Sequence, residues 1–302
     1  MRRLSAPRDA RWTRFAAQNR GKAMRIEKVL NNNVVVALDE NGAETVLMGR
    51  GLGFGRRAGD EAPAAQVEKR FTLHSDQLSD RFQQLITSIP LPHFLMSERI
   101  INHAKIALGK ELSDSIYVTL PDHISAAIHR YKEGIRLPNP LLWDIRQFYK
   151  DEYQVGSKAN EIVREETGVE FTEDEAGFIA MHFVNAQVGG EIRDVYDMTY
   201  LMQEVFRIVR SAYGFEPDCD SIDYYRFVTH LKFFARRIVS GQQYGDEDAD
   251  LLGVVRYKYP RAFACAQKVC AYVKREKGFA SGQNELLYLT IHIARVMDKN
   301  AG

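Results

Sequence analysis

Four histidines lie at recurring places in the part of the chain beyond residue 75. His123 and His182 form one pair, and His230 and His292 form a second pair with nearly the same separation in sequence. Each lies within an apolar stretch of helical spacing, where a single histidine is most often a silent, hydrogen-bonded residue of the core. Imidazole is also a nucleophile that is near neutral at pH 7, so reversible phosphorylation of a ring nitrogen is the competing interpretation.

Two other chemistries explain repeated histidines less well. No Asp, Glu or Cys recurs with them at metal-ligand spacing and no nucleophile recurs beside them, so we expect no metal, cofactor or catalytic residue. A phosphoryl group would instead add negative charge that nearby cations could bind. Arg226 lies four residues before His230, and Arg295 lies three residues after His292. Arginines on a helix face are usually just solvated, so this observation is weak by itself.

A stretch rich in Gly and Arg near the N-terminus offers a different chemistry. Residues 49–57, GRGLGFGRR, contain four Gly, three Arg, one Phe and no acid, and three Asn stand together at 31–33. Arg can contact phosphate, an exposed Phe can stack on an unpaired base, and Asn can bind base edges. The stretch lacks the signature of a P-loop and the strand–turn–helix context of a dinucleotide fingerprint. A glycine-rich turn with solvated Arg is the alternative.

Short strands are expected to hold these groups. β-branched runs predict strands at Met24–Leu30, Asn33–Leu38 and Glu44–Met48, with a hairpin turn at Asn41-Gly42. A fourth strand at 52–57 is weakened by its glycines, and residues 58–74 are expected to form a linker. So small a sheet is marginal alone, and we expect a second copy to complete it as a homodimer. Residues 24–57, which we call the head, have no recognition helix, so they suit a structured RNA better than B-DNA.

From Ser75 onward the periodicity is helical. Helices are predicted at about 78–89, 93–108, 115–131, 141–152, 157–167, 173–187, 198–213, 221–239, 247–257, 261–276 and 283–298. Residues 141–182 match 251–292 at a constant offset of 110, with ten identities in 42 positions. Chance alone would give about one identity in sixteen positions. His123 and His230 correspond at an offset of 107. The part of the chain from Ser75 onward, which we call the body, is therefore predicted to consist of two helical repeats of about 110 residues each.

Composition adds few constraints. The chain has 302 residues, a length that suits two or three domains. Its net charge is +1, so composition alone predicts no nucleic-acid partner. Residues 1–23 hold seven Lys/Arg and one acid, and we expect them to be a disordered leader or an extension ahead of Met24. No apolar run is long enough to span a membrane. The three Cys lack metal or disulfide spacing, so a cytoplasmic location is expected.

Five stretches, in order, resemble those of a known family. They are KVLNNNVVVALDENG…VLMGRGLGFGRRAGD, LPNPLLWDI, DEAGFIAMHFVNAQ, VTHLKFFARRI and LLYLTIHIARV. Together they resemble the bacterial sugar-operon transcriptional antiterminators, most nearly the regulators of aryl-β-glucoside use. The resemblance spans about residues 24–298.

The resemblance implies a multidomain α+β fold. After the leader at 1–23, it implies a dimeric antiparallel β head, the RNA-binding co-antiterminator domain with its linker, at 24–74. Two homologous all-α helical bundles, the regulation domains of the phosphotransferase system (PTS), would follow at 75–188 and 189–302. The protein would be no enzyme. It would bind a leader-RNA hairpin, the ribonucleic antiterminator, and prevent terminator formation upstream of a sugar operon, with β-glucosides the expected sugars.

The resemblance also implies roles for particular residues and partners. The RNA-contacting positions fall on Lys28, Asn33, Gly49, Arg50 and Phe54. The phosphorylatable histidines fall on His123, His182, His230 and His292. The implied partners are the general phosphocarrier protein and a sugar-specific enzyme II permease, to which the protein would be recruited at the membrane, and no DNA.

Three rivals stay open on the residues alone. A PTS-regulated DNA-binding activator would need a helix-turn-helix before residue 75. A histidine- or metal-dependent enzyme could use a duplicated helical scaffold. In an interaction protein, all four histidines would be inert.

Overall fold

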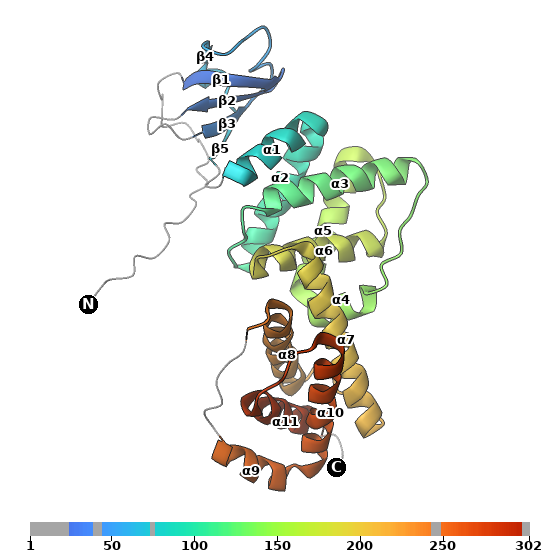
Figure 1. Ribbon diagram of the computed structural model, residues 1–302. Coiled ribbons are helices and arrows are strands. Elements are labelled where there is room, and N and C mark those ends of the chain that lie inside the picture. Colours follow the sequence, from blue (N-terminus) through green and yellow to red (C-terminus); the bar gives the residue numbers. More distant parts are fainter. Residues whose placement is uncertain (1–23, 39–43, 73–75, 243–248, 298–302) are drawn as a thin grey trace, which may run out of the picture. The chain divides into compact units, whose positions relative to one another are not determined.

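The computed structural model describes residues 24–38, 44–72, 76–242 and 249–297 (Figure 1). The leader at 1–23 and the hairpin turn predicted at Asn41-Gly42 lie outside these ranges. The described residues form two compact units. The first comprises residues up to Leu137 together with Lys158–Thr172, and the second comprises Pro138–Ser157 together with the residues from Glu173 onward.

The first unit begins with a five-stranded antiparallel sheet in the order β4-β1-β2-β3-β5 (Figure 1). Its strands are β1 (Met24–Asn31), β2 (Val34–Leu38), β3 (Glu44–Met48), β4 (Glu61–Ala62) and β5 (Lys69–Thr72). The first three predicted strands are confirmed. The strand predicted at 52–57 is wrong, because these residues form turns with Gly51 and Gly55 at φ of 69° and 70°. Residues 58–74, predicted as a linker, contain β4 and β5 instead.

Both faces of the central strands are covered. On one face, a small core joins the four strands β1 to β4 to the loop that follows β3; it consists of Ile26, Val35, Ala37, Leu47, Leu52 and Ala62. Elsewhere in the sheet Phe71, which lies opposite Val46 in the register, packs against helical residues. Its ring centroid is 5.4 Å from that of Phe82 and 5.5 Å from that of Phe94. Helices of the same unit thus provide packing for which the sequence alone suggested a second copy.

Eleven helices follow in the described part of the chain, so the predicted β head and all-α body are confirmed. They are α1 (Asp76–Ser88), α2 (Leu91–Leu108), α3 (Ile116–Lys132), α4 (Leu142–Phe148), α5 (Lys150–Thr167), α6 (Glu173–Val188), α7 (Ile192–Tyr213), α8 (Ile222–Ser240), α9 (Ala249–Lys258), α10 (Pro260–Lys277) and α11 (Gln283–Met297). The offset found in the sequence repeat carries the first residues of α5 and α6 onto the first residues of α10 and α11.

The start of α5 differs from the prediction, which placed it at residue 157. Gly156 lies inside the helix, although its lack of a side chain favours a break. A Cβ at Gly156 would come within 2.1 Å of the carbonyl oxygen of Ala176 on α6. The glycine therefore permits close packing of the two helices instead of ending one of them.

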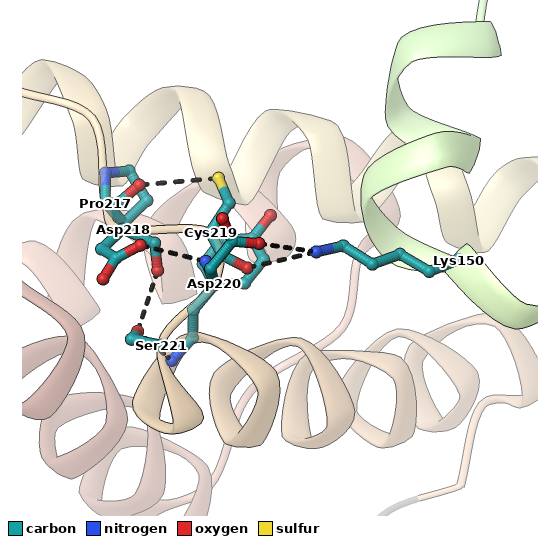
Figure 2. Close-up of polar contacts among 7 residues, drawn as sticks. Lys150, Pro217, Asp218, Cys219, Asp220 and Ser221 are labelled. Atoms are coloured by element: carbon teal, nitrogen blue, oxygen red, sulfur yellow. Dashed lines mark hydrogen bonds and ion pairs between the residues drawn. The ribbon is translucent and has the colours of Figure 1, made fainter.

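A fixed turn starts α8, the helix that carries His230. Ser221 Oγ accepts a hydrogen bond from a backbone N–H of the first helical turn at 3.1 Å. Figure 2 shows that Lys150 on α5 reaches the residues just before this cap. Its Nζ donates to the carbonyl oxygen of Cys219 at 3.4 Å and pairs with the Asp220 carboxylate at 3.3 Å. These contacts connect the start of α5 to the turn that precedes α8.

Candidate functional sites

The stretch rich in Gly and Arg forms a loop that is hydrogen-bonded to the turn between β1 and β2. The N–H of Gly49 donates to the carbonyl oxygen of Asn33 at 2.9 Å, and the N–H of Gly51 donates to Asn33 Oδ1 at 2.9 Å. The N–H of Gly53 donates to the carbonyl oxygen of Asn32, also at 2.9 Å. The asparagines thus accept three backbone donors and fix the loop.

Two positions of this loop must be glycine, because a side chain there would collide with the neighbouring backbone. A Cβ at Gly49 would lie 1.8 Å from the carbonyl oxygen of Gln66, and one at Gly53 would lie 2.2 Å from that of Asn31. No side chain fits at either position. Arg56 closes the loop from within, because its Nη1 donates to the carbonyl oxygens of Gly51, at 3.3 Å, and of Leu52. The composition of the stretch did not distinguish this structural arginine from its neighbours.

The loop leaves a cation and an aromatic ring exposed. Phe54 is 72% exposed. Arg50 is also exposed, and its backbone N–H donates to Glu68 Oε1 at 3.1 Å. Lys28 is exposed on β1, the strand that leads into the turn. Gly49 is buried, and Asn33 Oδ1 is engaged within the protein, so Asn33 can offer an RNA base its amide nitrogen. The five predicted residues therefore divide into exposed groups and groups that shape the loop.

In the second unit, His230 on α8 and His292 on α11 face each other. Their ring centroids are 4.6 Å apart and the rings are nearly perpendicular, at 87°. They line a groove of about 690 Å³. The other lining residues are aromatic, cationic and polar: Tyr225, Arg226, Thr229, Phe233, Arg237, Asn284, Glu285 and Tyr288. Two histidines that are distant in sequence thus form one site.

Both rings are kept neutral near pH 7. Burial lowers the pKa of His230 to about 4, and His292 and Arg237 add to the effect. Burial also lowers the pKa of His292, with further lowering by Arg295 and Arg226. Nδ1 of His292 is buried and makes no hydrogen bond to a described residue, so chemistry at this ring is confined to Nε2. Neutral imidazole is the form that attacks a phosphoryl donor.

The two arginines of the groove differ in availability. Arg237 forms a bidentate pair with Glu285, with Nε–Oε1 and Nη2–Oε2 distances of 2.6 and 2.7 Å. Arg226 is 58% exposed and lies 3.9 Å from Asp223, a separation that makes a weak ion pair. Arg226 is therefore the cation better able to turn toward a new negative charge in the groove.

The other two histidines lie in different units. His123 is half-buried on α3 of the first unit, next to the buried Ile124. His182 is half-buried on α6 of the second unit, between the buried Met181 and Phe183. Their positions in the repeat correspond to those of His230 and His292.

Comparisons with known proteins match the regions of the chain that contain the two sites. A family model described as "CAT RNA binding domain" matches residues 24–80, and one described as "PRD domain" matches residues 98–186 and 203–296. The chain is 46% identical over 274 residues to "Transcription antiterminator LicT" of Bacillus subtilis (strain 168), covering 91% of this chain and 99% of that relative. It is 41% identical over 273 residues to "Beta-glucoside operon antiterminator" of Dickeya chrysanthemi, covering 90% and 96%.

A solved structure is also similar to part of the chain. It is titled "Structure of the LicT Bacterial Antiterminator Protein in Complex with its RNA Target", and the match covers 18% of this chain and 98% of that chain at 48% identity, with a TM-score of 0.17.

The antiparallel sheet and the duplicated helical body coincide with the matched CAT RNA binding and PRD domains, and together they define an RNA-binding regulator. With the matched domains and relatives, the chain belongs to the family of transcription antiterminators that join a CAT RNA binding domain to two PRD domains. This family consists of RNA-binding regulators and not of enzymes. Among the described residues, no helix is long and apolar enough to cross a membrane.

Proposed function

We propose that this chain is a cytoplasmic antiterminator that binds a leader-RNA hairpin of a β-glucoside operon and thereby prevents terminator formation. The observation that carries the proposal is the loop at 49–57, which has a fixed backbone and an exposed Arg50 and Phe54. The relatives, named as antiterminators and in one case of a β-glucoside operon, support the operon class.

The exposed groups suit a hairpin with unpaired bases. Lys28 and Arg50 contact phosphates, and Phe54 stacks on a base that is out of the helix. Asn33 donates from its amide nitrogen to a base edge, and Gly49 lets the loop backbone keep its shape beneath them. Two heads of a homodimer bind one hairpin in this proposal.

The regulatory half of the proposal concerns the histidines. The phosphocarrier protein or a sugar-specific enzyme II permease transfers a phosphoryl group to a ring nitrogen of His123, His182, His230 or His292. In the groove of the second unit, neutral rings and the available Arg226 support this role. The added negative charge changes how the regulation domains pack, and this packing sets the arrangement of the two heads.

A DNA-binding activator is less well supported. The described residues ahead of α1 form a sheet and a short 3-10 turn at Ala64–Gln66, where that function would need a helix-turn-helix.

The RNA assignment is tested with the full chain and the RNA target of LicT as the probe. Arg50→Ala and Phe54→Ala should each weaken binding at least about tenfold, because a phosphate contact or a stacked base is lost. Arg193→Ala removes an exposed charge on α7 of the second unit and serves as the control, with unchanged affinity expected. Equal affinity of Arg50→Ala, Phe54→Ala and the unmodified chain at fixed salt would contradict the proposal.

A further inference from the structure

Asn31 stands between the RNA-binding loop and the helical part of the first unit. Its Nδ2 donates to the carbonyl oxygen of Ile86 on α1 at 3.1 Å, and its Oδ1 accepts the N–H of Asn33 at 2.9 Å. Asn33 Oδ1 in turn accepts the N–H of Gly51 at 2.9 Å. Two side-chain amides therefore connect the end of a helix to the loop at 49–57.

The sequence explains why Ile86 needs this donor. Within a helix its carbonyl oxygen would accept the N–H of the residue four positions later. That residue is Pro90, which has no N–H. Ile86 is buried, at 3% exposure, so water is a poor substitute and an unfilled acceptor would be costly. Because Pro90 cannot donate, the carbonyl oxygen of Ile86 lacks its helical partner, and Asn31 donates to it instead.

A second contact binds the backbone of Asn31 to the same loop. A Cβ at Gly53 would lie only 2.2 Å from the carbonyl oxygen of Asn31, so the two backbones pack closely. A displacement of Asn31 would therefore displace the loop. A separate hydrogen bond, from Gln83 Nε2 on α1 to Glu44 Oε2 on β3 at 3.1 Å, joins α1 to the sheet without involving the loop. Gln83 therefore offers a matched control.

We propose that Asn31 is a positioning residue for RNA binding, which holds the loop of Arg50 and Phe54 against the end of α1. It acts through Asn33 and Gly51 and not through a contact with RNA. The inference rests on the RNA-binding function proposed above. It makes affinity depend on the bond from Asn31 to the end of α1, so a helix outside the head contributes to the RNA site.

The test uses Asn31→Asp and Asn31→Ala in the full chain, with the RNA target of LicT as the probe. The aspartate keeps an oxygen for the Asn33 N–H but turns an oxygen toward Ile86, whereas the alanine removes both bonds without adding charge. Both should bind about fivefold to fiftyfold more weakly, the size expected when a buried acceptor loses its donor. The slope of log affinity against log salt should stay unchanged for Asn31→Ala, because no phosphate contact is lost.

Two comparisons make the result specific. Arg50→Ala should lower the salt slope by about one phosphate contact, and Gln83→Ala should change affinity by less than about twofold. The proposal is wrong if both Asn31 variants bind like the unmodified chain. It is also wrong if Asn31→Ala lowers the slope as Arg50→Ala does, or if binding is lost together with folding of the sheet in thermal unfolding. Failure of the unmodified chain to bind would instead contradict the proposed function.

Discussion

The loop at 49–57 and the groove of His230 and His292 are built in opposite ways. The loop has a fixed backbone and permanently charged or aromatic side chains in solvent, including Phe54 at 72% exposure. The groove has half-buried rings that burial keeps neutral. A surface that is always charged binds RNA but cannot change its own state. A neutral site beside an available Arg226 gains a charge upon modification, so the groove is the element suited to switching.

The loop side of this comparison is tested by Gly49→Ala. The new Cβ would lie 1.8 Å from the carbonyl oxygen of Gln66, so the backbone must move. We expect at least a hundredfold loss of RNA binding and about 3 kcal/mol lower stability of the head, at the upper end for overpacking. Binding and thermal unfolding measure the two effects.

Gly55→Ala provides the matched control, because Gly55 has φ of 70° but nothing within 4 Å of an added Cβ. Its cost should be confined to about 1 kcal/mol of backbone strain, with a much smaller change in affinity. Equal effects of the two variants would show that close approach at Gly49 does not shape the loop.

The groove side of this comparison is tested by the effect of low pH on the stability of the protein. With a folded pKa of about 4 for His230 and an ordinary value of 6.5, the unfolded chain binds a proton between these pH values that the folded chain does not. The contribution of neutral His230 to the free energy of unfolding is therefore fully present above pH 6.5 and is lost as the pH falls toward 4. After allowance for partial exposure, it amounts to roughly 2 kcal/mol.

Denaturant unfolding of the full chain at pH 7.5 and 4.5 measures this contribution. The unmodified protein should lose roughly 2 kcal/mol more than His230→Gln, which cannot titrate. The other charged groups of the groove, such as Asp223 and Glu285, are present in both proteins, so their effects cancel in the difference. Identical losses would mean that the ring is not kept neutral by burial.

The sequence was sufficient for the parts of the fold that depend on local patterns. β-branched runs located β1 to β3, and helical spacing located the body, including the constant offset between its repeats. One error arose where a tertiary contact overrides local preference, and another where glycines adopt turn conformations. Gly156 permits a close helix contact inside α5, and Gly51 and Gly55 take turn conformations that exclude the strand predicted at 52–57.

The candidate sites show the same division. Family resemblance pointed to exposed groups such as Arg50 and Phe54, whose chemistry is visible in their residue type. It did not reveal that Arg56 closes the loop or that Asn31 donates a hydrogen bond to the carbonyl oxygen of Ile86, because such roles depend on the folded backbone. The repeat predicted that His230 and His292 occupy corresponding positions to His123 and His182, but the contact of the two rings and the low pKa of His230 follow from packing and burial.

The most direct test of the account measures RNA affinity before and after phosphorylation by the phosphocarrier protein. The unmodified chain should take up acid-labile phosphate and change its affinity at least about tenfold, whereas His230→Ala/His292→Ala should show a smaller change. Arg226→Gln should become phosphorylated but respond about threefold less, because one cation is missing. Phosphorylation of His230 or His292 that leaves RNA affinity unchanged would contradict the account.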